Sequence, residues 1–287
     1  MHIFAMTNQI KHYVFFAVFF VVTAALFCID ARAEESKKSA PLLRYSVVHT
    51  YPHGASHFTQ GLIFHDGKIL ESVGRYGSSA LIEKELVTGK TLRFRANSAD
   101  VFAEGLTNIG HTFFQLTWKE HVALIYNEGL NLIGKRRYAT EGWGLAAFGN
   151  PAQLIMSDGS SHLYFLDPKD FSKRREITVH YGTREIPLLN ELETANGLIY
   201  ANLWLTDLIA VIEPADGSIV AWLNLSALKQ SFDKPKNWDA REHVLNGIAY
   251  DPRSGNFYVT GKCWPALFEI QVDRSPLAAY AGTATPQ

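Results

Sequence analysis

The sequence predicts an all-β protein, a five-bladed β-propeller built from four-stranded antiparallel blades, with one or two short helices in insertions. Two observations predict this fold. Short apolar runs alternate with turn signals from residue 44 onward, and a Gly-Leu or Gly-Ile step returns at Gly61, Gly105, Gly144, Gly197 and Gly247, at spacings of 44, 39, 53 and 50 residues. A period of that length suits one four-stranded sheet, and such sheets bury each other's faces when they are arranged radially.

The turns that join the expected strands have recognisable sequences. The stretches "HDGK" at 65–68, "SDGSS" at 157–161, "ADGS" at 215–218 and "RSGN" at 253–256 predict hairpins, because glycine supplies the positive φ that tight turns need. Long helical periodicity is scarce. Only "LNLSALKQSF" and "KNWDAREHVL" allow short helices, both in an insertion near residues 223–245.

The two ends of the chain are expected to lie outside the propeller. Lys11 and His12 precede an apolar run, and Ala31-Arg32-Ala33 follows it, which is the pattern of a secretory signal peptide cleaved after residue 33. The apolar run is short for a membrane span, although a retained anchor is the alternative. We therefore expect a signal peptide at 1–33, a flexible segment at 34–43, the propeller at 44–274 and a frayed tail at 275–287.

Composition limits the classes of partner. Apolar residues make up 47% of the chain, enough for a large core, and the formal net charge of −1 gives no reason to expect nucleic-acid binding.

Cleavage of the signal peptide would leave Cys263 as the single cysteine, either a small buried hydrophobe or a catalytic thiol. No histidine or cysteine spacing is typical of a metal site. We expect no cofactor, no membrane contact after cleavage, a periplasmic or secreted location, and a monomer.

The repeats differ at the residue that precedes the shared glycine. These residues are Gln60, Glu104, Trp143, Asn196 and Asn246. The innermost strands of a propeller line its central channel, and their ends lie at one mouth of that channel. Different polar groups at equivalent positions would therefore meet around one pocket. The alternative is that they cap neighbouring blades through hydrogen bonds.

A second ring of candidates follows the next strand of three repeats. It consists of Trp118, Trp204 and Lys262. Aromatic side chains near the channel mouth would form a cage for a small, partly apolar ligand, although each tryptophan alone fits core packing as well.

Taken in order along the chain, these motifs resemble the glutamine cyclotransferase family of plant latex and bacteria. The stretches that carry the resemblance run from Tyr51 to Val272. They are "HFTQGLIF", "FAEGLT", "QLTWKE", "EGWGLA", "SDGSSHLYFLDP", "LNELE", "GLIYANLW", "VLNGIAYD" and "VTGKCWPALFEI". The segments 169–187 and 226–243 are less recognisable. The resemblance implies a five-bladed propeller, which agrees with the repeat count.

The resemblance also implies an activity and a set of site residues. The activity is that of a glutaminyl-peptide cyclotransferase, an acyltransferase that turns the N-terminal glutamine of peptides or proteins into pyroglutamate and releases ammonia without a metal. Glu104 would bind the α-amine and shuttle protons. Gln60, Asn190 and Lys262 would bind the carboxamide or stabilise developing oxyanion charge. The walls of the pocket would be Phe58, Phe102, Trp118, Trp143 and Trp204.

Chemistry alone supports Glu104 best, because a carboxylate in an aromatic pocket has a raised pKa and suits general acid–base catalysis near neutrality. Two other functions remain open at this point. One is a calcium-dependent propeller lactonase, which would typically have six blades and several acidic ligands in its channel. The other is a secreted propeller that binds a ligand without catalysis. Ammonia release from a glutamine peptide in the presence of a chelator would distinguish them.

Overall fold

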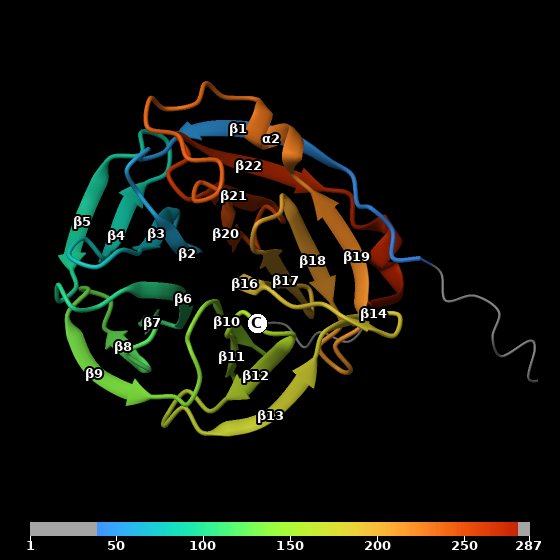
Figure 1. Cartoon of the computed structure of the whole chain (residues 1–287), viewed down its shortest axis with the longest axis horizontal. Helices are drawn as coiled ribbons and strands as arrows, with labels where there is room; N and C mark the ends of the chain where they lie inside the picture. The colour runs from blue at the N-terminus through green and yellow to red at the C-terminus, as the bar shows by residue number, and fades with distance from the viewer. Residues whose placement is uncertain (1–38, 281–287) are drawn as a thin grey trace, which may run out of the picture. The chain divides into compact units, whose positions relative to one another are not determined.

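The computed structural model describes residues 39–280. The expected signal peptide at 1–33 therefore lies outside the described residues, as do residues 281–287. The chain divides into two units, Met1–Ser39 and Ala40–Gln287, and only the second is described below. It contains five four-stranded antiparallel sheets set around a common axis, which confirms the predicted five-bladed β-propeller (Figure 1). No helix among residues 39–280 is long and apolar enough to cross a membrane.

The blades follow one another along the chain, and each begins with its innermost strand (Figure 1). The first is β2 (Thr59–His65), β3 (Lys68–Val73), β4 (Ala80–Glu85) and β5 (Thr91–Ala96). The second is β6 (Ala103–Ile109), β7 (Thr112–Thr117), β8 (Val122–Tyr126) and β9 (Leu132–Arg137). The third is β10 (Leu145–Phe148), β11 (Gln153–Ser157), β12 (His162–Leu166) and β13 (Lys173–Thr178).

A two-stranded hairpin of β14 (His180–Tyr181) and β15 (Arg184–Glu185) separates the third blade from the fourth. The fourth blade is β16 (Leu189–Ala195), β17 (Leu198–Leu203), β18 (Leu208–Ile212) and β19 (Ile219–Asn224). The fifth takes β20 (Leu245–Tyr250), β21 (Phe257–Gly261) and β22 (Ala266–Val272) from the end of the chain, and β1 (Tyr45–Pro52) from its beginning.

The pairing of β1 with β22 closes the ring (Figure 1). The residues just before β1 also pack against the propeller. Leu42 forms a bridge with Trp222 of the fourth blade, and Leu43 is buried. The segment expected to be flexible therefore contributes at its end to the packing between the fourth and fifth blades.

All four predicted hairpin turns join consecutive strands, and Gly67, Gly159, Gly217 and Gly255 have φ between 76° and 85°. Of the two expected helical stretches, the first contains α2 (Ser226–Gln230), whereas 236–245 forms turns that lead into β20. Beyond the fifth blade, a 3₁₀ helix, η1 (Ser275–Tyr280), buries Leu277, so the expected frayed tail begins with an ordered turn.

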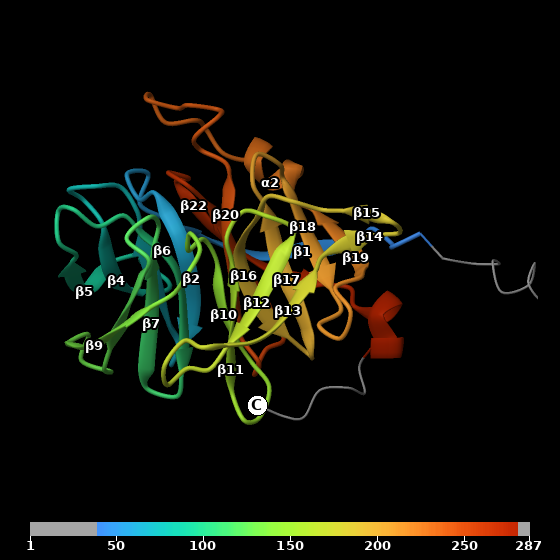
Figure 2. The same ribbon diagram turned by 60° about the horizontal axis from the view of Figure 1, so that its bottom comes forward.

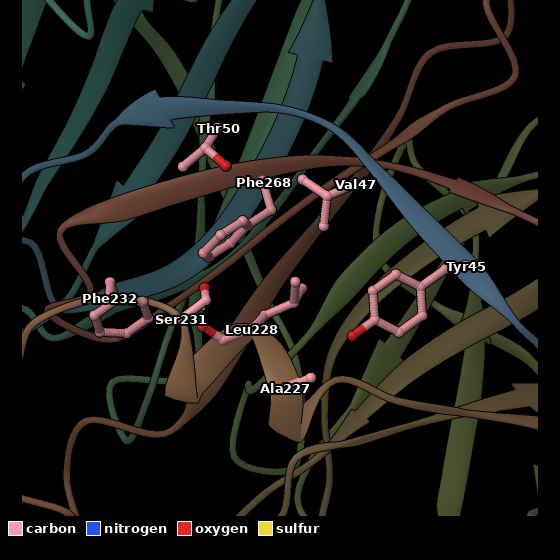
Figure 3. A pocket seen from close by; sticks show the side chains of 8 residues that line it. All are labelled: Tyr45, Val47, Thr50, Ala227, Leu228, Ser231, Phe232 and Phe268. Atoms are coloured by element: carbon pink, nitrogen blue, oxygen red, sulfur yellow. Dashed lines mark hydrogen bonds between the residues drawn. The ribbon is translucent and has the colours of Figure 1, made fainter.

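The helix α2 lies along the outer edge of the fifth blade. A hollow of about 490 Å³ separates it from β1 and β22, and its apolar lining includes Tyr45, Val47 and Phe268 (Figure 3). After α2 the chain runs through a long connection, residues 231–244, that stands out from one side of the ring (Figure 2). This connection matters for the site, because it reaches the mouth of the central channel.

The shared glycines allow neighbouring innermost strands to approach closely. A Cβ on Gly61 would lie 2.4 Å from the backbone nitrogen of Leu106, and one on Gly144 would lie 2.0 Å from the carbonyl oxygen of Asn190. Real Cβ contacts of that length do not occur, so any side chain there would push two blades apart. The recurring glycine is thus a packing requirement, whereas the residue before it is free to differ.

The fourth blade departs from the repeat predicted from the sequence. Its innermost strand is β16, so Gly197 lies in the turn between β16 and β17, and the equivalent of the shared glycine is Glu191. The fourth repeat can also be aligned on Leu192 in "LNELE", and the structure shows that this earlier start is correct and that the start at Gly197 is wrong. The carboxylate of Glu191 accepts backbone N–H bonds from Leu62 and Ile248, and thus links the innermost strands of three blades.

Candidate active site

Irregular pairing at the start of the innermost strands aims the candidate side chains at the channel mouth. The register between the first and second strands shifts between Thr59 and Gly61, and between Ala103 and Leu106. The same occurs from Leu189 to Leu192 and from Leu245 to Ile248. Such bulges turn a side chain out of the regular alternation and are common next to active sites. Gln60, Glu104, Asn190 and Asn246 all lie at these irregularities.

The structure brings all nine predicted site residues to a single pocket of about 340 Å³, a size typical of small-molecule sites. They are Gln60, Glu104, Asn190 and Lys262 together with Phe58, Phe102, Trp118, Trp143 and Trp204. Asn196, which the sequence placed among the mouth residues, is instead exposed in the turn after β16 with a φ of 51°. It was assigned to the mouth because the repeat was aligned on Gly197. The chemical roles of the nine residues stay predictions.

A chain of side-chain amides leads to the buried carboxyl group. Nε2 of Gln60 donates to Oε1 of Glu104 at 2.9 Å, and Nδ2 of Asn246 donates to Oε1 of Gln60 at 3.3 Å and to the carbonyl oxygen of Thr59 at 2.9 Å. The bond from Asn246 thereby holds the side chain of Gln60 in place. Gln60 in turn fixes the orientation of Glu104, which is only 5% exposed.

Burial dominates the electrostatics of the pocket. It raises the pKa of Glu104 well above its ordinary value; Lys262 opposes this effect, whereas Glu141 and Glu120 add to it. Burial also lowers the pKa of Lys262, an effect that Glu104 opposes. Nζ of Lys262 lies 4.8 Å from the centre of the Phe58 ring. The carboxyl group of Glu104 therefore holds a proton more readily than an exposed glutamate does.

Asn190 brings a buried, unpaired amide oxygen to the pocket. It is 2% exposed, and its Oδ1 has no hydrogen-bond partner among the described residues. Its backbone is held firmly, since its carbonyl oxygen accepts the hydroxyl of Ser157 at 2.7 Å. Buried amide oxygens are nearly always bonded, so this one fits a site whose partner is a bound molecule.

Aromatic rings in edge-to-face contact form the walls. Ring centres are separated by 6.3 Å for Phe58 and Phe102, by 5.5 Å for Phe102 and Trp118, and by 5.4 Å for Trp143 and Trp204. These separations and tilts are typical of favourable aromatic pairs. The result is an aromatic enclosure around the side chains of Glu104, Lys262, Gln60 and Asn190.

Three further residues line the pocket, namely Arg75, Arg241 and Glu242. Arg75 follows β3 closely, at nearly the position that Trp118, Trp204 and Lys262 hold in their own blades, so comparison of the repeats could have found it. Its guanidinium lies 4.4 Å from the centre of the Phe58 ring. Arg241 and Glu242 come from the connection after α2, which has no counterpart in other repeats and gave no signal.

A cluster beside the pocket offers ligand types that the sequence spacing did not reveal. Glu71 is fully buried, and its carboxylate is bonded by His53 at 3.0 Å and by His57 at 2.9 Å. These three groups could hold a metal ion. However, Nζ of Lys84 already lies 2.5 Å from the same carboxylate, and its charge helps to hold the pKa of Glu71 well below the ordinary value. A cation of the chain's own is thus already paired with this carboxylate.

Fold and site together define a class: five-bladed propellers with a buried acid in an aromatic pocket at the channel mouth. Comparison with known proteins makes the class specific, because residues 20–272 match the glutamine cyclotransferase family. The chain belongs to this family. It is 38% identical over 234 residues to a glutaminyl-peptide cyclotransferase of Arabidopsis thaliana, covering 80% of this chain and 71% of that protein.

A solved structure agrees. The crystal structure of a glutaminyl cyclase from Myxococcus xanthus superposes with a TM-score of 0.73 at 35% sequence identity, and the match covers 81% of this chain and 98% of the other. The similarity therefore extends over the whole propeller rather than over a few motifs.

Proposed function

We propose that this protein is a glutaminyl-peptide cyclotransferase, which converts the N-terminal glutamine of peptides or proteins into pyroglutamate with release of ammonia. The observation that carries the proposal is the buried carboxyl group of Glu104, with its raised pKa, in an aromatic pocket that also presents an unpaired amide oxygen. Membership of the glutamine cyclotransferase family and the names of the two relatives support it.

In the reaction, the free α-amine attacks the γ-carbonyl carbon of the same residue. A carbon–nitrogen bond forms to the amine, the bond to the amide nitrogen breaks, and ammonia leaves. The two reacting groups are already tethered, so the enzyme gains most by holding the glutamine curled and by moving protons. Glu104 takes a proton from the attacking amine and returns it to the leaving nitrogen, and the raised pKa of its buried carboxyl group favours acceptance of that proton.

The remaining polar groups handle the carboxamide. Oδ1 of Asn190 accepts an N–H of the substrate amide, which gives the buried oxygen the partner it lacks. Lys262 lies in the same pocket and stabilises the negative charge that develops on the amide oxygen. The aromatic rings exclude water, and this strengthens each of these interactions.

Ammonia release from a glutamine-initiated dipeptide, measured with and without a strong chelator, tests the proposal. We expect release that survives exhaustive chelation, since Lys84 is already paired with the carboxylate of the buried His53–His57–Glu71 cluster. Release that depends on added calcium would favour a metal-dependent propeller hydrolase, and no release from any glutamine peptide would favour a binding protein. A serine-initiated dipeptide is the control, because it lacks a carboxamide to lose.

We also propose that the chain is exported, that residues 1–33 are removed as a signal peptide, and that the mature protein is a monomer in the periplasm or the medium. The sequence pattern Lys11, apolar run, Ala31-Arg32-Ala33 supports this. Mass spectrometry of the secreted or periplasmic protein should find Glu34 as the first residue. A chain that keeps residues 1–33 and sediments with membranes would contradict it.

A further inference from the structure

One carboxylate oxygen joins two walls of the pocket. Oε2 of Glu141 accepts the indole N–H of Trp118 at 2.7 Å and that of Trp143 at 3.0 Å. Trp118 follows β7 of the second blade, whereas Trp143 precedes β10 of the third. We propose that Glu141 is a positioning residue, which fixes both indoles at the separation and tilt that the substrate's glutamine side chain needs. The inference rests on the proposed function.

The hydrogen bonds of the Glu141 side chain are all made to the pocket walls. Its carboxylate forms no ion pair with a lysine, arginine or histidine among the described residues, and the two indoles are its side-chain hydrogen-bond partners. It is half-buried, and a carboxylate there loses hydration without a cation to offset the cost. An apolar side chain would avoid that cost but could not accept the two indole N–H bonds, so the acceptor oxygen is the feature that explains a glutamate at this position.

The backbone around Glu141 is held in place as well. The amide of Gly142 donates to the carbonyl oxygen of Trp118 at 3.1 Å. A Cβ on Gly142 would lie 2.4 Å from the hydroxyl of Tyr138, so the chain passes too close to the second blade for any side chain. Glu141 is therefore presented to both indoles from a fixed position.

The other contacts of the indoles, including that of Trp118 with Phe102, are made by ring faces and edges and not by the indole N–H groups. The ring of Trp143 rests on Gly159, where a Cβ would lie 2.7 Å away, and meets Trp204 edge-on at 89°. The ring of Trp118 has the ammonium of Lys119 3.9 Å from its centre. Ring contacts of this kind have little directionality. A directional N–H bond to Glu141 decides which edge of each indole faces the pocket.

A test must separate the acceptor from the charge, because the charge of Glu141 also raises the pKa of Glu104. Glu141→Gln keeps an acceptor oxygen and removes the charge. Glu141→Leu removes both at similar size. Glu120→Gln is the matched control: Glu120 acts on Glu104 in the same direction, but its carboxylate accepts from the hydroxyl of Tyr76 and the backbone of Phe102 instead of from an indole.

We expect Glu141→Leu to raise KM and to lower kcat/KM roughly 10- to 100-fold for a glutamine dipeptide, the scale on which misplaced binding groups act. Its tryptophan emission should shift. Glu141→Gln should retain kcat/KM within a few-fold on the pH plateau and keep the wild-type emission. In Glu141→Gln and Glu120→Gln alike, the acid limb of the kcat/KM profile should move to lower pH, because the pKa of Glu104 falls when a nearby negative charge is removed.

Two outcomes would overturn the proposal. One is a folded Glu141→Leu protein with wild-type KM and emission. The other is Glu141→Gln as impaired as Glu141→Leu, which would make the charge the active feature. If Glu141→Leu does not fold, Glu141→Ala carries the same expectations. If the wild-type chain releases no ammonia, the proposed function fails, but calorimetric binding of the same dipeptide across these variants still tests the positioning.

Discussion

At the scale of single residues, the site depends on one carboxyl group whose surroundings are mostly apolar. Glu104 has one side-chain hydrogen bond, from Gln60, and its pKa is raised chiefly by burial. Burial of this kind makes a carboxyl group a stronger proton acceptor than an exposed one, which suits a group that must accept a proton and return it. The same group exposed on the surface would stay ionised and would be a poor acid.

Replacing Glu104 tests this directly. Glu104→Gln keeps the size and the ability to bond Gln60 but removes the titrating group, so kcat should fall by roughly two to four orders of magnitude while KM changes little. Steady-state kinetics on ammonia release, with circular dichroism to check the fold, measures both. Near-wild-type turnover in a folded variant would remove Glu104 from the mechanism.

Gln60 is tested by the effect of its replacement on kcat/KM and on the pH profile, because its side chain bonds both Glu104 and Asn246. Gln60→Leu should lower kcat/KM roughly 5- to 150-fold, the equivalent of about 1–3 kcal/mol for a buried polar group left unpaired. The bond from Gln60 lowers the pKa of Glu104. Its loss should therefore raise that pKa and move the acid limb of the kcat/KM profile to higher pH.

The competing explanation is that Gln60 merely ties blades together. That explanation predicts a lower melting temperature, with kcat/KM and its pH limb unchanged for the folded fraction. Melting and kinetics measured on one preparation decide between the two.

At the scale of elements, the innermost strand of the fourth blade shows how the position of a residue along a strand decides whether its side chain reaches the pocket. Asn190 lies at the irregular start of β16 and lines the pocket, whereas Asn196 lies at the turn that ends it. Six residues apart in one hairpin, they have the same side chain and opposite surroundings. One is buried with an unpaired oxygen, and the other is exposed with the left-handed backbone that asparagine and glycine tolerate.

These two asparagines form a matched pair for mutation. Asn190→Leu should lower kcat/KM roughly 5- to 150-fold, because the substrate amide would lose its buried partner. Asn196→Gly should leave kinetics unchanged and alter stability by no more than about 0.5 kcal/mol, since glycine adopts the same positive φ. Equal effects of the two substitutions would contradict the assignment of Asn190 to the pocket.

The same blade shows how far sequence could lead. The turns and four of the five innermost strands are predictable, because a tight turn needs glycine and close approach of blades excludes a side chain. The fourth strand is hidden because Glu191 replaces the glycine and links blades through its carboxylate instead. Arg241 is hidden for another reason: its connection belongs to no repeat, so only the folded chain brings it to the mouth.

At the scale of the whole molecule, the propeller is closed by contacts between distant parts of the chain. The strand β1 completes the fifth blade, and the residues just before it reach the fourth. Leu43 belongs to a core cluster that also contains Leu223 of β19 and Val272 of β22. Since the pocket draws residues from all five blades, the geometry of the site depends on this closure.

Adjacent leucines allow the closure to be tested without truncation. Leu43 is 3% exposed and Leu42 is 61% exposed. Leu43→Ala should lower the free energy of unfolding by about 2–5 kcal/mol, the range for a buried leucine, and the melting temperature by roughly 2–4 °C for each kcal/mol. Leu42→Ala should change the free energy by no more than about 0.5 kcal/mol. Denaturant titrations followed by tryptophan emission and by ammonia release would measure both the stability of the fold and the integrity of the site.

Because closure of the ring holds the pocket together, activity should be lost together with structure in the Leu43→Ala protein, at a lower denaturant concentration than in the wild type. Equal midpoints for the two variants would mean that the segment before β1 does not contribute to closing the ring.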